Sequence, residues 1–147
     1  EFIFGTDGIG AENLIVNGLS ARNSYILKDV DRPTLYMNGP EIFNFTIETI
    51  PPLIQQVLSK NKLQLSGIDY FILHQANKYI LEFLISEIGL DISKCHIDMI
   101  NYGNTVSNTI PIALKDAFEQ RKIQEGDKVL LAGFGVGYSW CSTIITI

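Results

Sequence analysis

The segment Tyr70-Phe71-Ile72-Leu73-His74-Gln75-Ala76-Asn77 decides the fold of this chain. Its first four residues have the composition of a β-strand and show no polar alternation, which is typical of a strand covered on both faces. Apolar side chains then recur at helical spacing from Ile80 to Ile88, and Gly89 is a natural helix C-cap. A buried strand that leads directly into a helix indicates an α/β fold.

The rest of the chain extends this alternation of strands and helices. Apolar residues at helical spacing predict a helix over 41–59, which Pro51-Pro52 should kink or divide. Pro111 suits the first turn of another helix, and residues 1–40 are mostly loop-rich. Further strands are predicted over 13–17, 97–100, 128–132 and 139–147. The prediction is therefore a mixed five-stranded sheet with helices on both faces, in one unit spanning residues 1–147.

Composition excludes several classes of function. The 147 residues are 46% apolar and 18% charged, with a formal net charge of -5 and a pI near 4.9. This acidic balance argues against nucleic-acid binding, which depends largely on Lys and Arg. No apolar run approaches the roughly 20 residues that span a bilayer, and the start lacks the basic region of a signal peptide. We expect a cytoplasmic protein that does not bind membranes and, because the chain begins with Glu1 and ends in a β-like run, a fragment of a longer polypeptide.

The cysteines and most aromatic residues are interpreted as structural. Cys95 and Cys141 form no CxxC pair and no recognisable zinc spacing with the two histidines, so no metal is expected. Cys95 and His96 are not interpreted as a nucleophile–base pair, since neighbours on an extended segment point to opposite sides. Cys141 is expected to be buried. Packing roles are predicted for four phenylalanines at helical spacing, Phe43, Phe45, Phe83 and Phe118.

Three polar segments follow predicted strands or precede a helix: 74–77, 102–105 and 133–137. In open α/β sheets, binding groups collect at the carboxyl ends of strands, so these segments are expected to converge on one pocket. Each alone has a structural explanation, because a single His, an Asn beside Gly and a Gly-x-Gly-x-Gly run are all common in ordinary loops. The residues of the three segments and the order of the segments along the chain carry more information than any single segment.

That ordered set resembles the C-terminal half of 3-oxoacyl-(acyl carrier protein) synthase III, a ketoacyl synthase of the thiolase superfamily. The matching text is Phe-Ile-Leu-His-Gln-Ala-Asn at 71–77, Tyr-Gly-Asn-Thr at 102–105 and Leu-Leu-Ala-Gly-Phe-Gly-Val-Gly at 130–137 with Trp140. Residues 37–43 and Thr6-Asp7-Gly8 resemble further family segments. The likeness covers nearly the whole chain.

The resemblance implies the second half of a layered αβαβα thiolase fold. The first half would carry a nucleophilic Cys, which an acyl-CoA acylates before a malonyl-(acyl carrier protein) loses carbon dioxide and attacks the acyl-enzyme. This is a decarboxylative Claisen condensation of fatty acid biosynthesis, and it implies no cofactor. The expected partners are acyl carrier protein, acyl-CoA, the N-terminal half of the same polypeptide and a second copy in a homodimer.

The resemblance also assigns roles to residues of this chain. His74 and Asn104 would be neutral N–H donors to the enolate formed by decarboxylation. The backbone of Gly135, Val136 and Gly137 would help to hold a second oxyanion. Two residues, Phe134 and Asn77, would lie at the substrate pocket, with Asn77 mainly fixing the His74 loop. Lys78 would supply a weak contact to the carrier protein.

Three departures from the family pattern leave alternatives open. Val136 replaces a common Gly, Cys141 stands where Gly usually follows Trp140, and Tyr79 replaces an Arg that meets the acidic carrier protein. A condensing enzyme that takes only CoA substrates is therefore one alternative. A non-catalytic partner subunit is another. This chain alone, which lacks the family's nucleophilic Cys, is expected to be inactive.

Overall fold

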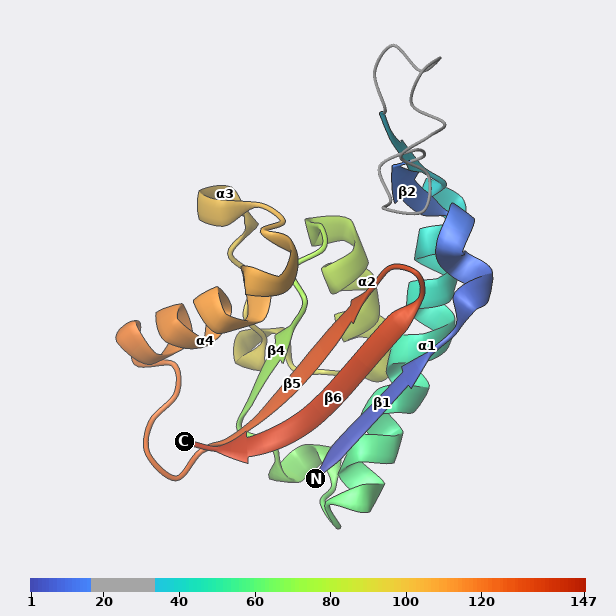
Figure 1. Ribbon diagram of the computed structural model, residues 1–147. Coiled ribbons are helices and arrows are strands. Elements are labelled where there is room, and N and C mark those ends of the chain that lie inside the picture. The colour runs from blue at the N-terminus through green and yellow to red at the C-terminus, as the bar shows by residue number, and fades with distance from the viewer. Residues whose placement is uncertain (17–33) are drawn as a thin grey trace.

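A computed structural model describes residues 1–16 and 34–147 (Figure 1). The strands are β1 (Phe2–Thr6), β2 (Leu14–Val16), β3 (Leu35–Met37), β4 (Tyr70–Leu73), β5 (Lys128–Gly135) and β6 (Ser139–Thr146). The α-helices are α1 (Gly39–Lys60), α2 (Lys78–Ile88), α3 (Met99–Tyr102) and α4 (Thr109–Glu119). A short 3-10 helix, Gly8–Glu12, follows β1.

The main sheet has the strand order β1-β6-β5-β4 (Figure 1). β4 and β5 are parallel, whereas β6 is antiparallel to both of its neighbours, so the sheet is mixed as predicted. β2 and β3 pair with each other in a separate two-stranded sheet. The predicted count of five strands in one sheet is wrong for the described residues, because β2 leaves the main sheet, residues 97–100 form no strand, and β1 was not foreseen.

β4 is the last strand of the main sheet, and all four of its residues are buried. Alternate side chains of a strand point to opposite faces. Phe71 and Leu73 pack in the core that contains the apolar faces of α1 and α2. Tyr70 and Ile72 pack on the other face with Ala113 and Ala117 of α4. Helices thus cover both faces of the sheet, as predicted.

α1 is a single helix of 22 residues that passes through Pro51-Pro52. Each proline removes a backbone donor, which led us to expect a kink or a division. The division does not occur. Buried residues before and after the prolines, including Ile50, Leu53 and Val57, belong to one core cluster that supports both halves of the helix.

The predicted strand at 97–100 does not form: residues 97–98 have no regular structure, and Met99 and Ile100 begin α3. The chain pairs with β4 at Cys95 instead, and the Gln75 side chain binds the backbone just beyond it. Its Nε2 donates to the carbonyl of His96 at 3.1 Å, and its Oε1 accepts from the N–H of Asp98 at 3.2 Å. Ile100, which the strand would have placed in the sheet, is 98% exposed.

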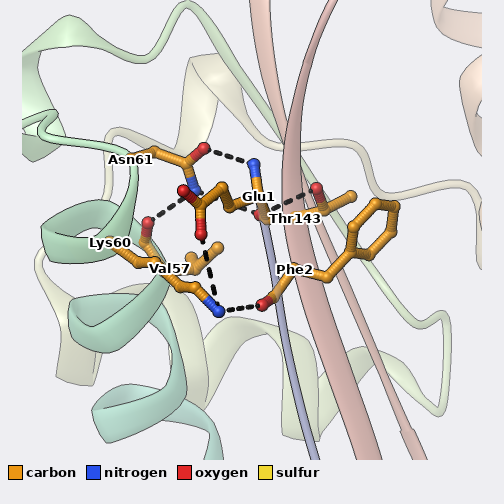
Figure 2. A network of polar contacts seen from close by, with 6 residues as sticks. All are labelled: Glu1, Phe2, Val57, Lys60, Asn61 and Thr143. Atoms are coloured by element: carbon orange, nitrogen blue, oxygen red, sulfur yellow. Dashed lines mark hydrogen bonds and ion pairs between the residues drawn. The ribbon is translucent and has the colours of Figure 1, made fainter.

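The end of α1 binds the first residues of β1 through polar side chains (Figure 2). Asn61 Nδ2 donates to the carbonyls of Glu1 at 3.1 Å and Val57 at 2.8 Å, and Lys60 Nζ donates to the carbonyl of Phe2 at 3.0 Å. Thr143 of β6 donates to the same Glu1 carbonyl. These contacts hold β1 against both the helix and the sheet.

Two packing predictions need correction. Phe45 is buried, and Phe43 and Phe83 pack edge to face with ring centroids 5.3 Å apart. Phe118 is 55% exposed, however, because the buried side of α4 is formed by smaller residues such as Ala113 and Ala117. Cys141 is half-buried rather than buried.

Within the described ranges, 1–16 and 34–147, no helix has the length and apolar character of a bilayer-spanning segment.

Candidate active site

His74 directly follows the carboxyl end of β4. Its backbone N–H donates to the carbonyl of Ala132 at 2.8 Å, which continues the pairing of β4 with β5. The half-buried ring lies edge-on to Phe134, with centroids 5.3 Å apart, and its Nδ1 is 2.6 Å from the hydroxyl of Thr109. Burial lowers the pKa of His74 below the ordinary 6.5. The imidazole is therefore neutral near pH 7.

Asn104 lies in the loop before α4, and its amide group has a defined orientation. Asn104 Oδ1 accepts from the backbone N–H of Val106 at 2.9 Å. Only the oxygen of the amide can accept this bond, so the orientation follows from the contact itself. The exposed Asn104 thus has its amide N–H groups directed away from that turn.

Val106 lies between these two polar side chains and has a positive φ of 58°. A β-branched residue rarely adopts this left-handed conformation. The carbonyl of Val106 faces Thr109, whose hydroxyl contacts His74. A continuous path of contacts therefore runs from Asn104 through the Val106 backbone and Thr109 to His74. The path begins at the carboxyl end of β4, where His74 lies.

Phe134, Gly135, Val136 and Gly137 form the end of β5 and the turn into β6. Val136 is not among the described residues with positive φ, so its backbone accommodates a Cβ. Its side chain is exposed. The turn therefore accommodates the Val136 side chain.

The N-terminal segment anchors this turn, a contact that the sequence analysis did not foresee. Tyr138, directly after the turn, exchanges backbone hydrogen bonds with Asp7 and accepts a third from the Thr6 hydroxyl at 2.8 Å. Its ring stacks on Phe45 with centroids 4.0 Å apart. The motif Thr6-Asp7-Gly8 was a visible signal, but its partner lies 132 residues away from Thr6.

Asn77 and Lys78 begin α2 beyond His74. Asn77 is the N-cap residue, and its Oδ1 accepts from the N–H of Ile80 at 2.8 Å. Lys78 is exposed, and its Nζ lies 3.7 Å from Oε1 of Glu82 in an i,i+4 ion pair. Tyr79 is exposed and stacks on Phe43 with centroids 5.7 Å apart. Asn77 therefore caps α2, the helix that follows His74.

The two cysteines lie in surroundings that disfavour a thiolate. Burial, with a contribution from Asp91, raises the pKa of Cys95 to about 12. Burial also raises the pKa of Cys141. A thiol needs a lowered pKa to act as a nucleophile near neutral pH. Neither cysteine has this property.

A small cavity of about 10 Å³ lies behind the 103–109 loop. It is lined in part by His96, which is 3% exposed and has no hydrogen-bond partner for either ring nitrogen within residues 1–16 and 34–147. One possible metal-ligand atom each of His96, Asp98 and Asp116 lies within 4.8 Å of the other two. Burial and then Lys122 lower the pKa of His96, against the opposite effect of the two carboxylates. Sequence spacing did not reveal this cluster.

The chain resembles known ketoacyl synthases in both sequence and structure. It is 37% identical to the β-ketoacyl-(acyl carrier protein) synthase III of Clostridium tetani, covering 96% of this chain and 45% of the relative. It is 35% identical to the corresponding synthase of Porphyra umbilicalis, over 95% of this chain and 44% of that relative. A crystal structure of a 3-oxoacyl-(acyl carrier protein) synthase III superposes with a TM-score of 0.94 at 35% sequence identity. The superposition covers 100% of this chain and 47% of the other protein.

A family profile described as "3-Oxoacyl-[acyl-carrier-protein (ACP)] synthase III C terminal" matches residues 58–147. The fold is thus thiolase-like, as predicted. The chain belongs to the 3-oxoacyl-(acyl carrier protein) synthase III family, of which it represents the C-terminal part. It spans about 45% of the length of the curated relatives that it matches.

Proposed function

We propose that this chain supplies the His–Asn half of the active site of a 3-oxoacyl-(acyl carrier protein) synthase III in fatty acid biosynthesis. The remaining half of the polypeptide supplies the nucleophilic Cys. An acyl-CoA transfers its acyl group to that Cys and releases CoA. Malonyl-(acyl carrier protein) then loses carbon dioxide, and its carbanion attacks the acyl thioester, forming a carbon–carbon bond and releasing the Cys thiolate. No cofactor is required beyond these substrates.

The observation that supports this proposal is the series of contacts that links His74, directly after β4, through Thr109 and the Val106 backbone to Asn104. Decarboxylation places negative charge on the thioester oxygen of the malonyl group. Fixed N–H donors stabilise such a developing charge without a proton transfer. The lowered pKa of His74 keeps its ring neutral, and the N–H of Val106 occupies the Asn104 oxygen, so the amide group would face the enolate with its N–H groups. Both side chains are thereby suited to donate.

The turn at 135–137 serves the second charge of the reaction. When the carbanion attacks, the carbonyl oxygen of the acyl-enzyme becomes an oxyanion, and backbone N–H groups of this turn, together with that of the Cys, hold it. Asp7 and Tyr138 keep the turn in place through their backbone hydrogen bonds. Phe134 borders the pocket through its contact with His74.

Acyl carrier protein is the proposed source of the malonyl group, and the whole protein is proposed to act as a homodimer. Lys78 provides a weak cationic contact, since Glu82 already neutralises part of its charge. Because Tyr79 stacks on Phe43 where many relatives have Arg, a CoA-linked extender is the second candidate. A comparison of malonyl-CoA with malonyl-(acyl carrier protein) as the extender in the full-length enzyme separates the two.

Removal of either donor tests the proposed function. In the full-length enzyme, His74→Ala and Asn104→Ala should each lower the rate of malonyl decarboxylation by about 10² to 10³, the usual effect of losing one oxyanion donor. Acylation of the Cys should remain largely intact. Release of carbon dioxide and intact-mass detection of the acyl-enzyme measure the two steps separately. Wild-type decarboxylation in both variants would reject the assigned roles.

A further inference from the structure

The hydroxyl of Thr109 faces two acceptors but has one proton to donate. His74 Nδ1 lies 2.6 Å from Thr109 Oγ1, and the carbonyl oxygen of Val106 lies 3.1 Å from it. If the proton points to Val106, Nδ1 of His74 must carry the imidazole proton and donate it to Oγ1. If the proton points to Nδ1, the imidazole proton is on Nε2. The direction of one hydrogen bond therefore sets the tautomer of His74.

The two distances favour donation to His74. Bonds of the N–H···O type span about 2.7 to 3.2 Å, whereas bonds donated by a hydroxyl are shorter, about 2.5 to 3.0 Å for O–H···O. The contact of 2.6 Å between Oγ1 and Nδ1 lies just below the usual N–H···O range and within the range of hydroxyl donors, so it favours an O–H donor. The hydrogen bond of 3.1 Å to Val106 lies just beyond the usual range of a hydroxyl donor.

The backbone around Thr109 supports the same direction. The carbonyl of Val106 already accepts the backbone N–H of Thr109, so it does not depend on the hydroxyl. Thr109 is 3% exposed, and its hydroxyl must therefore find its acceptor inside the protein. Since the Val106 carbonyl already has a donor, Nδ1 of His74 is the acceptor left for the hydroxyl proton. A neutral His74, with a free lone pair on Nδ1, can accept it.

We propose that Thr109 is a positioning residue that donates its hydroxyl proton to Nδ1 of His74 and so places the imidazole proton on Nε2. This inference rests on the proposed function for its purpose, since an Nε2–H group is what an enolate would require. One turn then orients both donors: the N–H of Val106 holds Asn104, and Thr109, at the first residue of α4, holds His74. The tautomer itself can be measured without any assay of activity.

The direct test is ¹⁵N NMR of the histidine side chains in the full-length protein. Protonated and unprotonated ring nitrogens of a neutral imidazole have well-separated ¹⁵N shifts. His74 is assigned from the signals that disappear in His74→Asn. The proposal expects a proton on Nε2 and none on Nδ1 near pH 8. A proton on Nδ1 would overturn it, whatever the enzyme's activity proves to be.

Variants of Thr109 provide the functional test. Thr109→Val keeps the shape but removes the hydroxyl, and it should convert the NMR signals to a mixture of tautomers or to the Nδ1–H form. Its kcat for malonyl decarboxylation should fall about 10- to 100-fold, the range known for partners that orient a metal-bound histidine, with KM unchanged. Thr109→Ser, which retains the hydroxyl, should restore both the tautomer and kcat.

Thr46→Val is the matched control. Thr46 is also a buried threonine, but its hydroxyl donates to the carbonyl of Ile42 within α1. The same substitution there should leave the His74 tautomer and kcat unchanged. If Thr109→Val does not fold, the wild-type spectrum and Thr109→Ser still decide the matter. A wild-type Nε2–H tautomer in a protein without condensing activity would reject the proposed function but uphold this assignment.

Discussion

At the scale of single residues, the two cysteines should be chemically inert. Cys95 and Cys141 both have raised pKa values, and burial is the main cause in each case. This chain should therefore show no acylation after incubation with acetyl-CoA or longer acyl-CoAs. Intact-mass spectrometry measures this directly. Alkylation of both thiols after denaturation is the control, and stoichiometric acylation mapped to either cysteine would contradict the prediction.

The buried histidine His96 should make stability depend on pH. Its pKa in the folded state is lowered from 6.5, mainly by burial, so below that pH the unfolded chain binds a proton that the folded protein does not. Its contribution to stability is present above pH 6.5 and is lost as the pH falls towards the lowered value. Carboxylates titrate near pH 4 and hardly interfere above about pH 5.5.

His96→Leu tests this dependence in the full-length protein. The variant removes ring nitrogens that have no partner within residues 1–16 and 34–147, so it should cost little stability at pH 7.5. Between pH 6.5 and 5.5 its denaturation midpoint should fall less than that of the wild type. His74, whose pKa is also lowered, contributes similarly, so the double variant with His74→Gln should be flatter still. Equal slopes in wild type and His96→Leu would refute the argument.

At the scale of elements, the turn between Asn104 and α4 contains a local conformational cost. Val106 has φ of 58°, and its side chain is 73% exposed, so little packing offsets the strain. Val106→Asn should raise the free energy of unfolding by about 1 kcal/mol, because Asn tolerates the left-handed region better. Urea denaturation of the full-length protein measures it. Ile100→Asn, at an exposed position without positive φ, should bring no such gain; a lower midpoint in Val106→Asn would be the opposite result.

At the scale of the whole molecule, the outer strand of the main sheet exposes apolar side chains. Phe2 and Phe4 of β1 are 57% and 76% exposed, and their cross-strand partners Thr143 and Cys141 lie on the same face. Exposed apolar patches and outer strands promote association. In the proposed full-length synthase, the other half of the polypeptide would cover this face.

The chain alone should therefore self-associate, which light scattering detects. Replacing Phe2 and Phe4 together by Ser should reduce the association. Ile92→Ser, at an exposed apolar residue outside the sheet, should leave it unchanged. A monomer at high concentration with both phenylalanines intact would argue against a docking face on β1.

Local patterns in the sequence determined the central unit of this protein. The apolar run of β4, the helical spacing of α2 and the left-handed Gly89 at its end were all predicted, because each depends on residues close in the chain. His74 was placed correctly for the same reason, since it directly follows β4. The resemblance of three motifs then indicated the family that the sequence comparison shows.

Tertiary structure alone decided how distant segments meet. The pairing of β1 with β6 and the anchoring of Tyr138 by Thr6 join residues that lie more than a hundred positions apart, and no local pattern encodes such partners. The predicted strand at 97–100 was wrong because the chain pairs with β4 at Cys95, and beyond it the Gln75 side chain binds the backbone of His96 and Asp98 before α3 begins. Thr109 was overlooked because its hydroxyl contacts a ring 35 residues away. Spacing identifies which residues share an element, whereas packing selects which atoms share a hydrogen bond.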